Sequence, residues 1–364
     1  PGVFDSATVD TNILIVEKTP DRHELQAVAI KGKEDFQSLA FSPLAVPADG
    51  AAWVLKSPIE QSIDEKVRKY GTPLKDWGIK INFGVKTGYN EAFIIDGDKR
   101  AELIAEDPKS AELIKPLLRG RDIERYYSAV ADKYIICTFP ALKIDIEEYP
   151  AIKQWLLSYD EKWLRTNSLG WIADNHLSEW CLQKLDQTGK EITIDEKIIK
   201  DSKSSAYKAR KRTGNQWFET QDQIGYHKEM VEEKIVWKRI GSILRFCYDD
   251  TGSVVLDSTC FSSGPNSKYL TAVLNSKMGH YLLKDAPKTG TGDLLISVQA
   301  LEPVRIPPLS SIERKPFEEL VDEVIRLKKQ NPDADISTQE EKINDKVLKL
   351  YNLSPDEIAI IRNL

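Results

Sequence analysis

The stretch from residue 203 to residue 261 constrains the fold more than any other part of the sequence. It opens with a basic run, is broken at Gly214-Asn215, and continues into an apolar run with a basic end at residues 234–240. Loosely alternating apolar residues lead to an Asp/Gly turn at 249–252, and 253–256 is apolar again. Runs of β-branched and aromatic residues on either side of such a turn predict two strands joined there.

Residues 195–245, which overlap the first part of this stretch, differ in charge from the whole chain. Between Asp195 and Arg245 there are 12 Lys and Arg against 8 Asp and Glu, while the formal net charge of the chain is −6. Cations interleaved with aromatic residues suit a phosphate backbone and exposed bases. A solvated basic loop followed by core strands explains the same residues. A sequence pI of about 5.5 also argues against binding nucleic acid by bulk charge.

A second segment with polar donors lies at residues 79–95. Residues 79–85 alternate with a period of two, which predicts a strand, and 92–95 are expected to return beside it. The turn between them contains Lys86, Thr87 and Asn90 as donors, and its Gly88 permits a positive φ. These donors suit a loop near DNA phosphates, although a plain hairpin turn explains them equally well.

A third segment, residues 117–123, contains two arginines. Arg119 and Arg121 are two positions apart, so an extended backbone would point both side chains the same way. Two such arginines are suited to grip adjacent phosphates or to read a guanine edge. The alternative is that Arg121 pairs with Asp122 or Glu124 at the surface.

Together these segments resemble the C-terminal target-recognition (specificity) domain of TaqI-like adenine-specific DNA methyltransferases. That domain also occurs in fused Type IIG restriction–modification enzymes. The resemblance covers about residues 70–364 and implies an α+β fold with mixed twisted sheets, surrounding helices and a C-terminal antiparallel helical tail. The best-matched segments are 84–95, 117–123, 217–240 and 294–307. The implied division is a remnant strand of an upstream methyltransferase domain at 1–18, a connector at 19–78, the DNA target-recognition domain at 79–310 and the helical tail at 311–364.

The resemblance also implies which residues bind double-stranded DNA. In the family this domain grips the duplex opposite the catalytic domain and helps to present a flipped adenine. Lysines and arginines of the basic run and of the glycine-rich loop 284–292 are expected on phosphates, and those near 120 and 238 on guanine edges. The candidate DNA-binding residues are Lys86, Thr87, Asn90, Arg119, Arg121, Lys208, Arg210, Lys211, Arg212, Trp217, Lys238, Arg239, Lys288 and Thr289.

Catalytic signatures are missing from the sequence. Asn331-Pro332, followed by Asp, is the chain's one Asn-Pro, so the Asn/Asp-Pro-Pro-Tyr/Phe tetrapeptide of adenine methyltransferases is absent. A Gly-rich loop for S-adenosylmethionine is absent too. We therefore expect a non-catalytic fragment without a cofactor, whose parent enzyme uses S-adenosylmethionine. The Asp/Glu-x-Lys triplets at 195–197 and 232–234 do not follow a suitably placed Pro-Asp and do not indicate a nuclease.

The remaining features set the compartment and one rival function. The four cysteines and four histidines are scattered, which predicts no metal site and free thiols in a reducing cytoplasm. No apolar run approaches the roughly 20 residues of a membrane span. Amphipathic helices at 312–329 and 337–350, and a last helix capped by Ser354, together with the acidic pI, favour the alternative of a protein-interaction or scaffold module, such as a Type I-like specificity subunit. Residues 140–202 receive no role.

Overall fold

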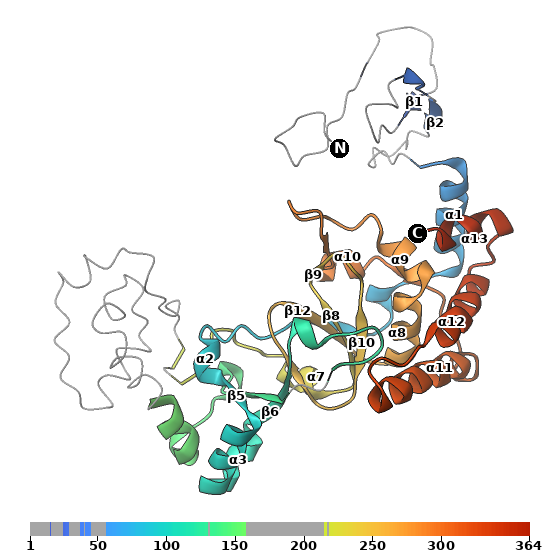
Figure 1. Ribbon diagram of the computed structural model, residues 1–364. Helices are drawn as coiled ribbons and strands as arrows, with labels where there is room; N and C mark the ends of the chain where they lie inside the picture. The colour runs from blue at the N-terminus through green and yellow to red at the C-terminus, as the bar shows by residue number, and fades with distance from the viewer. Residues whose placement is uncertain are drawn as a thin grey trace.

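The structure is a computed structural model that describes most of the chain from Lys56 onward (Figure 1). The strand expected within 1–18, most of the segment 140–202 and the basic run 203–212 lie outside the described residues, as does Trp217. The described residues are 15, 25–28, 37–39, 41–44, 56–129, 132–157, 215–216 and 218–364.

Two four-stranded sheets form the centre of the molecule. The first has the order β10 (Phe246–Asp249), β8 (Lys234–Lys238), β12 (Thr259–Ser263), β4 (Lys80–Phe83), and all its pairs are antiparallel. The second has the order β11 (Val254–Val255), β6 (Ile114–Leu118), β7 (Lys133–Ile136), β5 (Ile94–Asp96). In it β11 runs parallel to β6 and the other pairs are antiparallel. The mixed sheets confirm the predicted α+β class.

The prediction that the Asp/Gly turn joins two paired strands is wrong. β10 pairs with β8, and β11, on the other side of the turn, joins the second sheet beside β6. The Asp249 carboxylate accepts hydrogen bonds from the Thr251 backbone N–H at 3.2 Å and from its hydroxyl at 2.6 Å, which turns the chain locally. Alternation along a strand identifies its buried face but does not identify its partner.

The predicted return of residues 92–95 beside the strand at 79–85 is also wrong. Residues 90–93 form the short helix α2 (Asn90–Phe93), and β5 then pairs with β7 in the second sheet. The partner of β4 is β12. The turn before α2 is closed by the hydroxyl of Thr87, which accepts the Tyr89 backbone N–H at 3.1 Å, and Gly88 adopts a φ of 79° as expected.

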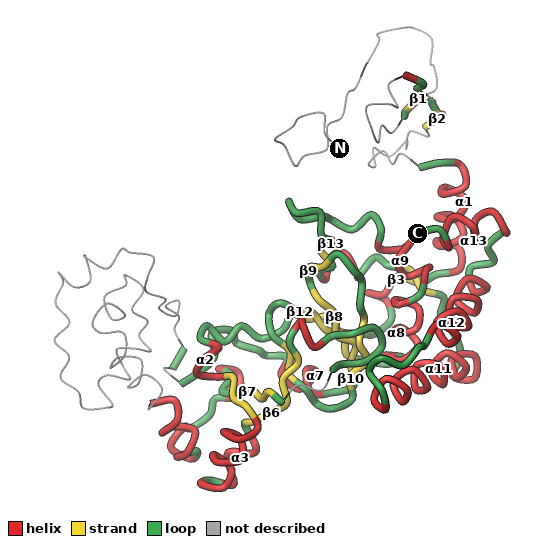
Figure 2. Tube along the Cα trace, in the orientation of Figure 1, coloured by secondary structure: helices red, strands yellow, loops and turns green. Residues whose placement is uncertain are grey.

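Helices cover the sheets and form the C-terminal region (Figure 2). Three short two-stranded pairs complete the fold: β1 (Leu25–Ala27) with β2 (Ser42–Leu44), β3 (Thr72–Pro73) with β14 (Arg305–Ile306), and β9 (Ile240–Gly241) with β13 (Leu294–Leu295). The helices are α1 (Pro58–Tyr70), α3 (Gly97–Glu106), residues 150–157, α7 (His227–Val231), α8 (Ser267–Asn275), α9 (Lys277–Leu283), α10 (Val298–Leu301), α11 (Ser311–Gln330), α12 (Ser337–Leu350) and α13 (Pro355–Arg362). None of the helices within the described ranges is long and apolar enough to cross a membrane.

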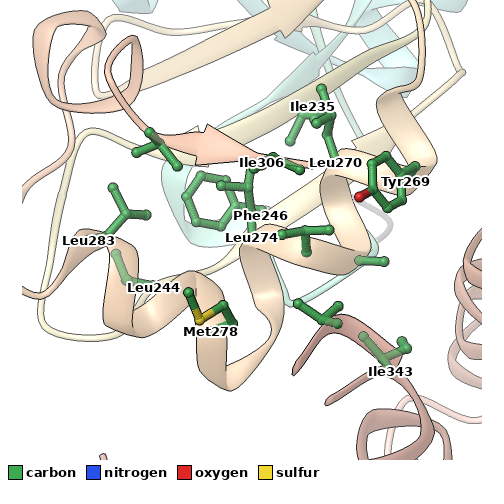
Figure 3. Packing of buried hydrophobic residues seen from close by; sticks show 14 of the residues in the cluster. Ile235, Leu244, Phe246, Tyr269, Leu270, Leu274, Met278, Leu283, Ile306 and Ile343 are labelled. Atoms are coloured by element: carbon green, nitrogen blue, oxygen red, sulfur yellow. The ribbon is translucent and has the colours of Figure 1, made fainter. Parts of the chain in front are cut away.

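The predicted tail helices pack into the main core. Val321 of α11 and Ile343 of α12 are completely buried in one cluster with Trp237 and Phe246 of the first sheet. Figure 3 shows Ile343 and Phe246 of this cluster. Arg125, which follows the second sheet's β6, forms an ion pair with Glu340 of α12 at 2.9 Å. The boundaries at 78/79 and 310/311 stay a prediction, but buried contacts cross both of them.

A buried ion pair joins the neighbouring antiparallel strands β8 and β10. Lys234 of β8 and Asp249 of β10 are partners in register, and both side chains are fully buried. Removal of one charge leaves the other without a partner in the interior, which costs about 3–5 kcal/mol. We predict that Asp249→Ala lowers the free energy of unfolding by that amount in urea titrations. The double variant Lys234→Met/Asp249→Leu should lose clearly less, and equal losses would contradict this account.

Acid should loosen the contact between α1 and α13. Burial raises the pKa of Glu357, but its hydrogen bonds from Lys66, Ser62 and the Ser354 backbone outweigh this effect and lower the pKa to about 2. The stabilisation is therefore present above pH 4.5 and is lost as the pH falls toward 2, an effect of about 3 kcal/mol. In Glu357→Gln, thermal unfolding should depend less on pH in this window. Glu319→Gln, at an exposed position of α11, should retain the wild-type pH dependence.

Candidate nucleic-acid interface

The turn that carries Lys86 lies against the end of β11. The backbone N–H of Val85 donates to Val255 O at 2.7 Å, and that of Asp257 donates to Val85 O at 3.0 Å. Gly84 permits this approach, because a Cβ at that position would lie 1.9 Å from the Leu256 carbonyl oxygen. Lys86 is exposed next to this contact.

Thr87, one of the predicted DNA contacts, forms its hydrogen bonds within the turn. Its side chain is buried, and its hydroxyl donates to Asn90 Oδ1 at 2.6 Å. Its backbone oxygen accepts the Gln221 N–H at 3.0 Å, and Asp222 Oδ2 accepts the Lys86 N–H at 3.2 Å. The hydroxyl is thus used within the turn, while the side chains of Lys86 and Asn90 stay exposed.

The backbone at Arg121 is not extended, so the condition under which Arg119 and Arg121 would point the same way is not met. Residues Gly120–Asp122 form a 3₁₀ turn, in which the Asp122 carboxylate accepts from the Arg119 backbone N–H, Nε and Nη2, each at 2.9 Å. The bond raises the pKa of Arg119. Arg119 is therefore held by Asp122. Asp122 was one of the two expected partners of Arg121, but it pairs with Arg119. Arg121 is exposed, and no ion pair is found for it among the described residues.

Lys238 lies against residues 119–122, which we call the arginine turn. A Cβ on Gly120 would be 3.3 Å from Lys238 Cε and 3.5 Å from Ser258 Oγ, so the turn sits beside this lysine at the end of β8. The next residue, Arg239, donates its backbone N–H to Ser258 O at 3.1 Å. Segments more than 100 residues apart in the sequence are therefore neighbours here.

The loop before β13 continues the same edge. Arg239 O accepts the Ile296 N–H at 2.8 Å, and β13 pairs with β9 directly after Arg239. Lys288 forms a β-bridge with Leu294 of β13, and Lys288 is exposed. The backbone of Thr289 is tied to Asp293 O at 2.8 Å, which closes the loop.

We call the resulting set the basic edge: Lys86, Asn90, Arg119, Arg121, Lys238, Arg239 and Lys288. The main-chain bonds of Val85, Asp257, Arg239 and Ile296 connect its parts in one series. Its acidic neighbours include Asp122, which is paired with Arg119, and the exposed Asp257. No motif in the sequence signals Ser258, whose backbone oxygen accepts the Arg239 N–H and whose Oγ lies beside Gly120. Lys208, Arg210, Lys211, Arg212 and Trp217 lie outside the described residues.

Two buried cysteine thiols have raised pKa values. Burial raises the pKa of the Cys260 thiol to about 12, although Arg239 opposes the shift. Burial likewise raises the pKa of Cys137 to about 12, and both thiols are free. Among the described residues no group of three His, Cys, Asp or Glu side chains is placed to hold a metal ion. The side chains of the edge donate hydrogen bonds and carry positive charge, which suits binding of an anionic partner.

Fold and edge together define a binding domain that presents donors from loops held by two small sheets. The chain belongs to the family of the TaqI-like C-terminal specificity domain, whose profile matches residues 115–302. Among solved structures it is similar to the Type IIL restriction-modification enzyme MmeI in complex with DNA, with a TM-score of 0.47 and 11% identity over 81% of this chain. It is also similar to the type IIG restriction endonuclease BpuSI, with a TM-score of 0.43 and 12% identity over 81% of this chain. The chain spans about a third of each, 36% and 33%. No curated protein matches it.

The different settings of the two arginines lead to a prediction about stability. Arg119→Ala removes the two side-chain hydrogen bonds to the buried Asp122 and should lower the free energy of unfolding by about 1–3 kcal/mol. The Arg119 backbone N–H still donates to Asp122, so the lower half of that range is expected. Arg121→Ala removes an exposed side chain and should change stability by less than about 0.5 kcal/mol. Urea unfolding of both variants measures the difference, and equal losses would disprove the assignment.

Proposed function

We propose that the chain is the DNA target-recognition portion of a restriction–modification enzyme and that the basic edge binds the duplex. Family membership supports a role in specificity. The observation that carries the proposal is the assembly of Lys86, Arg121, Lys238 and Lys288, from four separate segments, into one connected edge.

Two kinds of contact are expected from this edge. The next contacts suit phosphate oxygens, which fix position and orientation on the duplex: Lys86 on its turn, Asn90 at the start of α2 and Lys288 in the loop before β13. Arg121, which follows Gly120, and Lys238, whose side chain lies beside Gly120, suit a guanine edge in the major groove, where a bidentate contact discriminates by about 1–3 kcal/mol. Arg119, held by Asp122, supports the turn that presents Arg121.

We propose further that the parent enzyme is an adenine-N6 DNA methyltransferase of the Type IIG kind in the cytoplasm. In this proposal an upstream methyltransferase domain binds S-adenosylmethionine and performs the chemistry. Among the described residues, the connection between β5 and α3 does not offer the glycine-rich loop that would hold that cofactor. The strand-to-helix connection at β5 and α3 has a single glycine, Gly97, and the Asp132 carboxylate occupies the space beside it, 2.4 Å from a Cβ position. We therefore derive no catalytic step for this chain.

The scaffold alternative loses support from the packing of the tail. The apolar faces of the C-terminal helices were expected to bind another protein, but these faces are buried in the chain's own core. A protein-binding role would need apolar surface that remains free. The tail helices retain Ile312 and, at the chain end, Leu364 as exposed large apolar residues.

DNA binding by the basic edge should depend on salt. Each phosphate contact makes the slope of log affinity against log salt more negative by about 0.9. We expect Arg239→Ala and Arg121→Ala to weaken binding of a fluorescent duplex at fixed moderate salt by about tenfold, with 1–3 kcal/mol lost at a guanine contact. Lys315→Ala, on an exposed part of α11, serves as the control for loss of one positive charge.

The salt titration separates the two functions. Target recognition is supported if the affinity of the wild type falls steeply with salt. The affinity should also be lower in the edge variants but not in Lys315→Ala. Binding that barely responds to salt, or unchanged affinity in both arginine variants, would rule out the basic edge as the interface.

A further inference from the structure

Two large apolar side chains are exposed next to the basic edge, directly after Lys238 and Arg239 in the sequence. Ile240 is 43% exposed and Ile243 is 57% exposed, three residues apart in the connection between β8 and β10. Single exposed apolar residues are normal on a protein surface. Two such residues next to a row of cations need an explanation, because each exposes surface that another molecule can bury.

The backbone around these two isoleucines is held in place on both sides. Ile240 belongs to β9, which pairs with β13, and Arg239 before it is bonded to Ser258 and to Ile296. Leu244 after Ile243 is 8% exposed and packs in the core. The two side chains are thus presented to solvent from a fixed turn, which lowers the entropy cost of a contact.

Charge around the turn favours a polyanion over an apolar protein surface. Lys238 and Arg239 precede the turn, and Lys288 lies across β13 from it. The Asp293 carboxylate nearby accepts a hydrogen bond from Thr291 at 3.1 Å. Arg245 at the far end of the turn is paired with Glu124 at 2.8 Å. The isoleucines are therefore flanked by cations that would hold phosphates on either side of an apolar contact.

We propose that Ile243, assisted by Ile240, makes an apolar contact with the bases of the bound duplex and contributes to target recognition. This inference rests on the proposed function. The shared chemistry is apolar contact with a base, reached in one of two ways. The side chain packs on a thymine methyl group in a groove, or it inserts between stacked bases and opens a base step.

An apolar contact and a phosphate contact differ in their response to salt. We would first select duplexes that bind the wild-type chain from a randomised library, and then measure affinities for a selected duplex over a range of salt. Ile243→Ala should lower affinity by about tenfold at every salt concentration, because about three buried carbons are lost. The slope with salt should stay unchanged, whereas Lys86→Ala, at a proposed phosphate contact, should make the slope less steep.

The matched control is Ile312→Ala, which removes the same atoms from a residue that is 83% exposed on α11. It should bind as the wild type does. Ile243→Met keeps an apolar side chain and should retain most of the affinity. Thermal unfolding of each variant shows that the fold is kept.

Modified duplexes then identify the kind of contact. Replacement of thymine by uracil at one position should remove the difference between wild type and Ile243→Ala if a methyl group is bound. Enhanced fluorescence of 2-aminopurine, seen with the wild type and lost in the variant, indicates an opened base step. Wild-type affinity in Ile243→Ala, or neither response in the modified duplexes, overturns the inference. Failure of the wild-type chain to select any duplex instead contradicts the proposed function.

Discussion

The close approach of Gly84 to Leu256 is the contact on which the arrangement of the basic edge depends. A Cβ at residue 84 would lie 1.9 Å from a carbonyl oxygen, so only glycine lets the two backbones come together. This contact places the turn that carries Lys86 beside residues 255–258. Residues 257–258 in turn meet Arg239 and the arginine turn. β12 pairs with both β4 and β8 and relates these segments too, so the Gly84 contact sets how closely the Lys86 turn approaches the donors near residue 238.

The rest of the fold stabilises that arrangement from behind. β8 and β12 are buried along nearly their whole length, and the tail helices pack against the same core. Loops that bind a partner gain precision when the strands that carry them are rigid. The helical tail therefore contributes to the interface indirectly, because it supports the sheet whose strand ends present Lys238 and Arg239.

The sequence predicts some parts of this structure well and others poorly. Strands at 80–83 and 234–238 and the three tail helices follow from periodicity and caps, which are local signals. The partners of the strands are not local, and the expected hairpins at 249–252 and 86–90 are wrong for that reason. For the candidate site, charge and donor type indicated the segments. Whether Arg119 would bind a carboxylate or stay free depended on whether residues 120–122 turn or extend, which spacing alone does not decide. The burial of Thr87 arises from its contact with Gln221, 134 positions away, and is equally invisible in the pattern.

The central claim is that four separate segments form one surface that faces DNA. Hydrogen–deuterium exchange of the chain with and without bound duplex tests it most directly. The account predicts slower exchange at residues 84–90, 119–122, 238–243 and 287–294 together when duplex is added, with no change in the tail helices. Protection confined to the tail helices, or no protection at these four segments, would contradict it.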